Sequence, residues 1–242
     1  MKVVAIIQAR MGSTRLPGKI LAEIEGHPML WQVARRVQAA KTVEKIVVAT
    51  TTERSDDIVE AFCREHGLNC FRGSEKDVLD RYYRAAREYN AHAVVRITSD
   101  CPLIDPEIVD RTVRSFLQER PDYASNSLAC GYPRGLDTEV MSLSVLETAW
   151  REATADYQRA HVTPFFYENP ERFKILPITA EEEYSALRWT VDRPEDLEFI
   201  RAIYSRFRNG DFRFKEILRL LDREPALAEI NRAIRQRALQ EG

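Results

Sequence analysis

Long apolar runs are missing from this sequence of 242 residues, and its charges almost cancel. No stretch approaches the length of a membrane-spanning helix or of the apolar region of a signal peptide. The 36 basic and 38 acidic residues give a net charge of −2, so the overall charge does not favour binding to a nucleic acid or a membrane. We therefore expect a cytoplasmic protein that binds neither.

Paired cysteines are missing as well. The four cysteines are Cys63, Cys70, Cys101 and Cys130, and none belongs to a Cys-x-x-Cys pair. This spacing suggests neither a zinc site nor a disulfide framework, and reduced, buried thiols are the simpler interpretation. The sequence also contains no internal repeat, low-complexity tract or Gly/Ser linker. Its length suits one α/β domain with a sizeable core, and we predict a single domain spanning residues 1–242.

Short apolar stretches alternate with helical patterns over the first half of the chain. The apolar stretches suit parallel strands that are buried on both faces, and the alternation predicts a three-layer α/β/α fold around a mostly parallel mixed sheet. The expected strands are residues 3–7, 45–51, 68–71 and 93–98. The expected helices are residues 28–40, 55–67 with Ser55 as N-cap, a helix from about Asp77, and a helix capped by Asp105.

The second half of the chain is less regular. Residues 121–138 show no clear periodicity, and a loop of this length is usually functional. Beyond it the pattern predicts helices at 144–155 and 159–170, the second interrupted by Pro164, and amphipathic helices from residue 198 onward. Strands are expected at 20–24, 173–178 and 187–191.

The clearest functional pattern follows the first strand, in the stretch QARMGSTRLPGKIL at residues 8–21. The stretch contains two glycines that can adopt positive φ, Gly12 and Gly18. Its three cations, Arg10, Arg15 and Lys19, suit the several oxygens of a triphosphate bound at a strand end. A Walker A loop is excluded, because five residues separate the glycines and Ile20 stands where Ser or Thr is required. A basic turn exposed to solvent is the alternative interpretation.

Asp100 is the second notable residue, because it follows the fourth expected strand. A carboxylate at this end of a buried strand is well placed to hold Mg²⁺ bound to phosphates. An aspartate that caps a turn or helix would give the same sequence pattern.

The opening loop resembles the signature of the cytidylyltransferases that activate sugars, in particular the spore coat polysaccharide biosynthesis protein F family. The blocks TSDCPLIDP, YPRGLDTEV and LRWTVDRPEDLE extend the resemblance over nearly the whole chain. Synthetases of CMP-linked ulosonic acids, such as sialic acid and 3-deoxy-manno-octulosonate, open with a similar pattern. The chain differs from them at Gln8 and at Thr98-Ser99, which favours the spore coat branch.

The resemblance implies a fold of the nucleotide-diphospho-sugar transferase type and transfer of CMP from CTP to a hydroxyl of a sugar or sugar acid. Pyrophosphate would be released, Mg²⁺ would be the cofactor, and the product would serve surface polysaccharide biosynthesis. It further implies that residues 122–180 form a substrate-binding and dimerisation insertion, so that a homodimer is possible.

The resemblance also implies roles for individual residues. The catalytic residues would be Arg10, Arg15, Lys19 and Asp100, and the metal ligands Asp100 and Asp192. The nucleotide would contact Ala9, Arg10, Gly12, Ser13, Arg15, Lys19, Gly73, Ser74 and Arg81. The acceptor sugar would contact Asn126, Arg134, Asp137 and Glu139.

Several of these assignments have structural alternatives. A Gly-Ser turn before a capped helix needs no ligand, so Gly73 and Ser74 can be purely structural, and Arg81 can simply be solvated. A histidine in an aromatic-rich segment is more often a hydrogen-bonded structural residue, and we favour this interpretation for His161. No dedicated general base stands out, and a metal-bound alkoxide would make one unnecessary.

Two other functions are compatible with the predicted fold. A glycosyltransferase would use a nucleotide-sugar donor, but its usual Asp-x-Asp element is missing because Cys101 and Pro102 follow Asp100. A non-catalytic sensor of sugar nucleotides would be expected to lack a basic or acidic site residue, whereas all the predicted ones are present.

Overall fold

The computed structural model describes residues 1–129, 131–207 and 210–234. Its first half contains β1 (Val3–Gln8), η1 (Lys19–Leu21), β2 (Glu23–Ile24), β3 (His27–Pro28), α1 (Met29–Gln38), β4 (Lys45–Thr51), η2 (Arg54–Asp56), α2 (Asp57–Glu65), β5 (Asn69–Gly73), α3 (Val78–Glu88), β6 (Ala93–Thr98) and α4 (Pro106–Glu119). The second half contains β7 (Tyr123–Ser125), β8 (Glu139–Ser142), α5 (Leu143–Glu152), α6 (Asp156–His161), α7 (Pro164–Tyr167), β9 (Ile175–Pro177), α8 (Pro194–Tyr204), α9 (Phe214–Arg223) and α10 (Ala226–Glu229).

A seven-stranded sheet runs through the molecule in the order β5-β4-β1-β6-β8-β7-β9. All neighbouring strands pair in parallel except that β8 runs antiparallel to β6 and β7. The sheet is therefore mostly parallel and mixed, as the sequence predicts.

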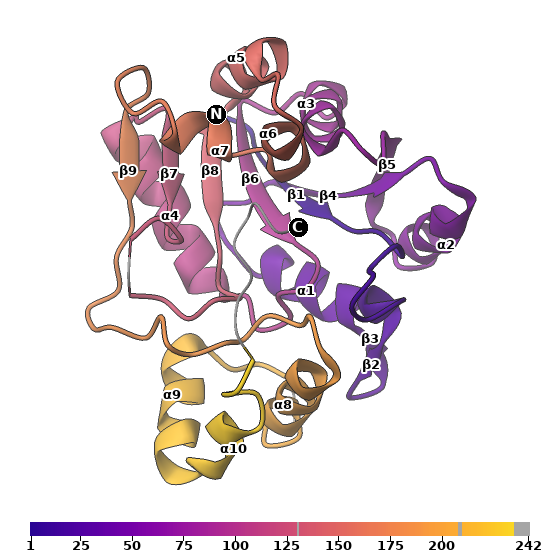
Figure 1. Ribbon diagram of the computed structural model, residues 1–242, viewed down its shortest axis with the longest axis vertical. Coiled ribbons are helices and arrows are strands. Elements are labelled where there is room, and N and C mark those ends of the chain that lie inside the picture. The colour runs from indigo at the N-terminus through magenta and orange to yellow at the C-terminus, as the bar shows by residue number, and fades with distance from the viewer. Residues whose placement is uncertain (130, 208–209, 235–242) are drawn as a thin grey trace.

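Helices cover both faces of this sheet (Figure 1). Along β1, Ala5 and Ile7 join the cluster packed by α1 and α4, whereas Val4 and Ile6 join the cluster packed by α3 and α5. Because both faces are buried, β1 is apolar from Val3 to Ile7 and shows no alternation of apolar and polar residues there. The three-layer α/β/α prediction is confirmed.

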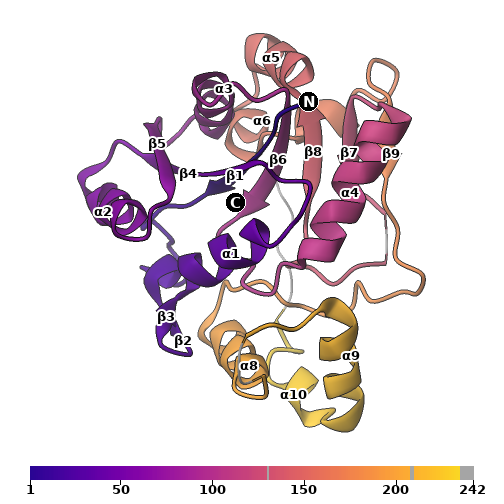
Figure 2. The ribbon, with the colours of Figure 1, turned by 180° about the vertical axis from the view of Figure 1, so that it is seen from behind.

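The C-terminal helices α8, α9 and α10 stand together beside one end of the sheet, as Figures 1 and 2 show from opposite sides. The buried Arg36 of α1 connects the main body to this group by donating to the carbonyls of Ile104, Gly210 and Phe212. Tyr204 of α8 donates to the Pro102 carbonyl, just beyond β6. The helical group therefore packs on the segment that carries Asp100.

Several expected elements are confirmed at or near their predicted bounds. The strands at 45–51 and 93–98 have the expected limits. Asp77 and Asp105 cap α3 and α4 by accepting backbone N–H groups. The stretch 159–170 is interrupted as expected, between α6 and α7.

Other expectations are wrong. Residues 20–24 do not form one strand, because η1 turns the chain and β2 pairs only with β3. Ser55 lies inside η2 and does not cap α2. Residues 187–191 form no strand either, since this segment has only an isolated bridge between Arg134 and Arg188. The strands β7 and β8 were not predicted, because each has too few residues to show a periodic pattern.

The C-terminal helical pattern is also divided. The helix α9 ends at Arg223, because Pro225 lacks the backbone N–H that continuation of the helix would need. The predicted helix beyond residue 234 lies outside the described residues. None of the helices in the described part of the chain has both the length and the apolar character that a membrane crossing requires.

Candidate nucleotide-binding site

A cavity of about 690 Å³ opens at the carboxyl ends of β1 and β6. Its lining comes from the loop after β1, the end of β6, the stretch 127–139, the α6–α7 segment, and residues 190 and 192. Ligands of parallel α/β sheets bind at this end of the strands, so the position of the cavity agrees with the fold.

The loop after β1 is held in a fixed shape by its own backbone and by one buried carboxylate. Met11 O accepts from the amides of Ser13 and Gly18, and Gly18 has φ +70°, which favours glycine. The Met11 amide donates to Asp56 Oδ1 at 2.7 Å. The cations of this loop therefore project from a pinned backbone.

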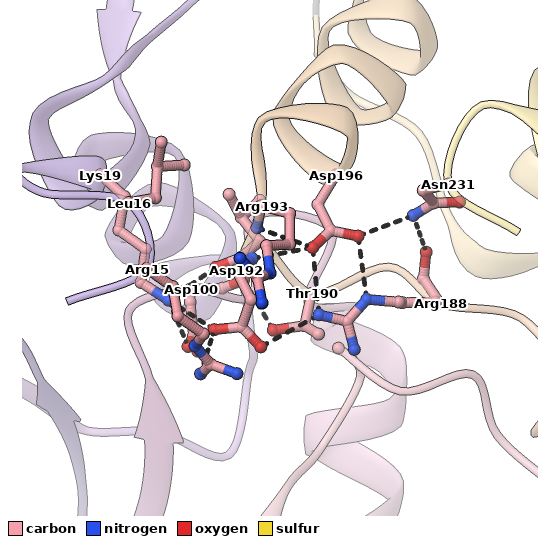
Figure 3. A network of polar contacts seen from close by, with 12 residues as sticks. Arg15, Leu16, Lys19, Asp100, Arg188, Thr190, Asp192, Arg193, Asp196 and Asn231 are labelled. Carbon is pink, nitrogen blue, oxygen red and sulfur yellow. Dashed lines mark hydrogen bonds and ion pairs between the residues drawn. The ribbon is translucent and has the colours of Figure 1, made fainter. Parts of the chain in front are cut away.

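Lys19 joins the two aspartates that the sequence singles out. Its Nζ atom lies 2.9 Å from Asp100 Oδ2 and 3.0 Å from Asp192 Oδ1, and it also donates to the Val191 carbonyl. Arg15 Nη2 lies 2.7 Å from Asp192 Oδ1. Two predicted phosphate ligands and two predicted metal ligands thus form one cluster (Figure 3).

The charges of this cluster are coupled. Burial would raise the pKa of Asp100, but the Lys19 ammonium and the hydrogen bond with Thr98 bring it down to about 2. Burial would lower the pKa of Lys19, but Asp100 and Asp192 outweigh it and raise that pKa. At neutral pH the Asp100 carboxylate and the Lys19 ammonium are therefore both ionised.

The segment that leads to Asp192 is not a strand of the sheet. The backbone amide of Val191 and the hydroxyl of Thr190 both donate to the Asp100 carbonyl. On its far side, Asp192 Oδ2 contacts Arg188 Nη2 at 3.0 Å. Hydrogen bonds to the Asp100 segment, in place of sheet pairing, bring the second aspartate to the first.

Most of the remaining predicted nucleotide ligands line the cavity. Ala9, Gly12 and Ser13 line it, and Arg10 lies at its exposed rim, 3.4 Å from Glu75. Arg81 also lines it but is only 1% exposed, so it is not the solvated arginine of the alternative interpretation.

Arg81 is anchored by the turn that precedes α3. Its Nη1 donates to the Ser74 carbonyl, while its Nε is buried and has no hydrogen-bond partner. Gly73 packs so closely that a Cβ there would lie 3.1 Å from the Arg81 side chain. Gly73 and Ser74 do not themselves line the cavity, so their contact with a nucleotide stays a prediction.

Three of the four predicted acceptor ligands line the cavity, namely Arg134, Asp137 and Glu139. The fourth, Asn126, is buried, donates to the Leu136 carbonyl and accepts from the Thr138 amide. It closes the base of the loop and does not line the cavity. Burial raises the pKa of Asp137, an effect that Arg134 partly offsets.

Sequence analysis did not identify every residue at the cavity. Arg96 of β6 forms an ion pair with Glu139 of β8, and Tyr123 donates to the same carboxylate. A charged residue inside an otherwise apolar strand was the signal that could have found Arg96. Ser127, Thr163 and Tyr167 also line the cavity, without a sequence pattern of their own.

His161 also lines the cavity, and its structural role stays a prediction, as does a contact with the substrate. The Thr163 amide donates to the His161 carbonyl, closing a tight turn at Val162, where φ is +72°. Positive φ is strained for a β-branched residue, and such strain is concentrated at functional sites. Within the described residues, no group of three or more His, Cys, Asp or Glu side chains forms a metal cluster.

Comparison with protein families gives a match over most of the chain. A family model described as cytidylyltransferase matches residues 4–224. An uncharacterized protein of Methanocaldococcus jannaschii is 37% identical over 243 residues, which cover 100% of this chain and 99% of that protein. The spore coat polysaccharide biosynthesis protein SpsF of Bacillus subtilis is 34% identical over 234 residues, covering 93% and 96%. The 3-deoxy-manno-octulosonate cytidylyltransferase of Pelobacter propionicus is 35% identical over 122 residues, covering 49% and 46%.

Solved structures are also similar. A cytidylyltransferase from Leptospira borgpetersenii superposes with a TM-score of 0.92 at 37% identity, covering 98% of this chain and 100% of that one. A CMP:2-keto-3-deoxy-manno-octonic acid synthetase complexed with CTP gives a TM-score of 0.65 at 21% identity, covering 85% and 99%. The second likeness concerns the fold alone.

Proposed function

Because this chain belongs to the cytidylyltransferase family, we propose that it transfers CMP from CTP to a hydroxyl of a sugar or sugar acid, releasing pyrophosphate. The observation that carries the proposal is the cluster in which Lys19 contacts both Asp100 and Asp192 at the cavity. The spore coat polysaccharide protein among the relatives supports a product destined for a surface polysaccharide.

The loop after β1 supplies the charge that a triphosphate requires. Arg15 and Lys19 leave their carboxylates, wholly or in part, to bind phosphate oxygens, and Arg10 approaches from the rim. An arginine fork suits two oxygens, and a lysine acts as a mobile point charge. Because Asp56 fixes the backbone of this loop, the two side chains can turn to the phosphates with little movement of the loop backbone.

The two aspartates fit a divalent cation. Asp100 and Asp192 each direct an oxygen at one Lys19 atom, so they converge on a position that already holds positive charge. One or two carboxylates completed by water and substrate phosphates are the usual ligands of Mg²⁺ in proteins. When bound there, Mg²⁺ would offset charge at the α-phosphate and lower the pKa of the acceptor hydroxyl.

The part of the cavity lining that comes from residues 134–139 suits the acceptor. Arg134, Asp137 and Glu139 offer hydrogen-bond donors and acceptors there, and Glu139 is already charge-compensated by Arg96. Such a wall would hold the reacting hydroxyl in line with the leaving pyrophosphate, which is the main contribution that a protein makes to this kind of transfer.

The alternative functions use the same cavity differently. A glycosyltransferase or a sensor would bind a nucleotide-sugar and would have no need for a loop suited to a triphosphate. A cytoplasmic location, the dimerisation role of residues 122–180 and the homodimer stay predictions.

A thermal-shift comparison of CTP, UTP, GTP, ATP and dTTP, each with and without Mg²⁺, tests the proposal. At a concentration of about 100 times Kd, a ligand stabilises the folded state by about 2.7 kcal/mol, a shift of a few degrees in Tm. We expect selective stabilisation by CTP with Mg²⁺, and its loss in Arg15→Ala.

The other outcomes are equally informative. Preference for another triphosphate would keep nucleotidyl transfer but reject CTP, and a response only to nucleotide-sugars would favour a glycosyltransferase or a sensor. Where CTP binds, pyrophosphate release in a panel of sugars and sugar acids then identifies the acceptor.

A further inference from the structure

Three cationic side chains contact Asp192, whose own side chain is only 6% exposed. Arg15 and Lys19 contact one of its oxygens, and Arg188 contacts the other. The first two are the cations that the proposed function assigns to phosphates. When they turn toward a substrate, Arg188 is the cation of this set that stays.

Arg188 does not line the cavity and is held by Asp196. Its Nε lies 2.9 Å from Asp196 Oδ1, and its Nη2 lies 3.0 Å from Asp196 Oδ2. The same Nη2 lies 3.0 Å from Asp192 Oδ2. One guanidinium therefore grips Asp196 with two nitrogens and shares one of them with Asp192 (Figure 3).

Asp196 cannot easily move, because it is fully buried and saturated with donors. The backbone amides of Asp192 and Arg193 donate to its Oδ2, and Asn231 Nδ2 donates to its Oδ1. Asn231 also donates to the Arg188 carbonyl, from the segment beyond α10. The C-terminal helical group thus fixes both the side chain and the backbone of Arg188.

The backbone of this segment is tied on the cavity side as well. The Arg134 amide donates to the Leu187 carbonyl, and the Trp189 amide donates to the Arg134 carbonyl. Arg188 therefore stands between the loop that carries Arg134 and the helix that begins at Pro194.

We propose that Arg188, fixed by Asp196 and Asn231, is a positioning residue that keeps Asp192 oriented and charge-compensated while Arg15 and Lys19 turn to the substrate phosphates. The inference rests on the proposed function, in which Asp192 holds a divalent cation. Without Arg188, the buried carboxylate of Asp192 would have no cationic partner while Arg15 and Lys19 turn to the phosphates, which is costly. Its side chain would also lose the contact that fixes its orientation. Residues behind a metal ligand commonly affect metal affinity 10- to 100-fold.

A purely structural role for Arg188, tying α8 to the sheet, makes a different prediction. Removing the arginine would then lower stability without changing how a folded protein binds a cation. The variants must therefore remain folded, and their affinity for a cation must be measured as well as their turnover.

The test compares Arg188→Lys and the double variant Arg188→Gln/Asp196→Asn with the wild type. The lysine keeps the charge but not the fork, and the double variant removes one charge of each sign, so neither leaves an additional unpaired buried charge. Arg206→Gln is the matched control, because Arg206 makes an exposed ion pair with Glu224 in the same helical group. Free Mn²⁺ is followed by electron paramagnetic resonance during titration, with and without CTP, on proteins whose fold is verified by circular dichroism.

We expect the Mn²⁺ dissociation constant of the double variant in the presence of CTP to rise by about 10- to 100-fold, with a smaller rise in Arg188→Lys. The control should match the wild type. Equal Mn²⁺ affinity in the folded double variant and the wild type would overturn the inference, as would a wild type that binds no Mn²⁺ in either condition. A wild type that binds Mn²⁺ without any effect of CTP would instead count against the proposed function, and the Mn²⁺ affinities without CTP would still decide the role of Arg188.

Discussion

Asp56 accepts a hydrogen bond from the backbone amide of Met11 at 2.7 Å, across 45 residues of sequence. Its other oxygen accepts from the backbone amide and the hydroxyl of Thr51 in β4. This carboxylate is 1% exposed and does not line the cavity. It therefore shapes the loop that carries Arg15 and Lys19 without a place in the site itself.

Asp56→Ala should weaken CTP binding, because the loop would lose its anchor on β4. The partly buried amide of Met11 and the buried amide of Thr51 would each lose an acceptor, so the free energy of unfolding should fall by about 1–3 kcal/mol. Thermal unfolding with and without CTP and Mg²⁺ measures both effects. Asp57→Ala is the control, since Asp57 is exposed and pairs only at the surface with Arg72. Equal CTP stabilisation in Asp56→Ala and wild type would contradict the anchoring role.

Asp100→Asn and Asp192→Asn should each reduce turnover by at least about 100-fold, by analogy with the loss of groups that hold or stabilise charge in active sites. Both variants should fold, since Asn keeps the shape and Lys19 retains the remaining aspartate. Pyrophosphate release measures turnover and circular dichroism verifies the fold. Asp222→Asn, on the exposed side of α9, should remain as active as the wild type. A fully active Asp100→Asn or Asp192→Asn would remove that aspartate from the mechanism.

Gly135→Ala should be far more destabilising than Gly67→Ala. Both glycines have positive φ, of +108° and +65°, so each alanine carries a backbone cost of about 1–2 kcal/mol. A Cβ on Gly135 would also lie 2.4 Å from the backbone carbon of Trp189, whereas a Cβ on Gly67 would meet nothing within 4 Å. Denaturant unfolding of the two variants measures the difference. Similar losses would show that the loop around Arg134 can separate from residues 187–191 without penalty.

Arg96→Met should lower the free energy of unfolding by about 3–5 kcal/mol, because it leaves the buried Glu139 carboxylate without its cation. The double variant Arg96→Met/Glu139→Gln should recover part of this loss, since the uncompensated charge is gone and Tyr123 retains an acceptor. Urea unfolding of both single variants and the double variant forms the cycle. Additive losses would mean that the two side chains do not stabilise each other.

Local sequence patterns were enough to predict most of the strands and helix caps in the first half of the chain. The strands at 45–51 and 93–98 and the caps at Asp77 and Asp105 depend on neighbouring residues, so apolar runs and capping side chains reveal them. The same reasoning failed at 187–191, because alternating apolar residues also suit an extended segment that pairs with no strand of the sheet. It missed Asp56, since a carboxylate before a helix looks like a cap until its partners in the loop after β1 and in β4 are known.

The sequence by itself determined the α/β alternation, the basic loop after β1, the two aspartates and, through the resemblance, the family. These features can be read from neighbouring residues, together with the rule that ligands of parallel α/β sheets bind at the carboxyl ends of the strands. Only the tertiary structure decided that Lys19 lies between Asp100 and Asp192, that Arg96 pairs with Glu139, and that Arg188 pairs with Asp192 and Asp196. Most of those contacts join segments that are distant along the chain, and they exist because packing of the sheet and the C-terminal helices brings buried charges to partners that neutralise them.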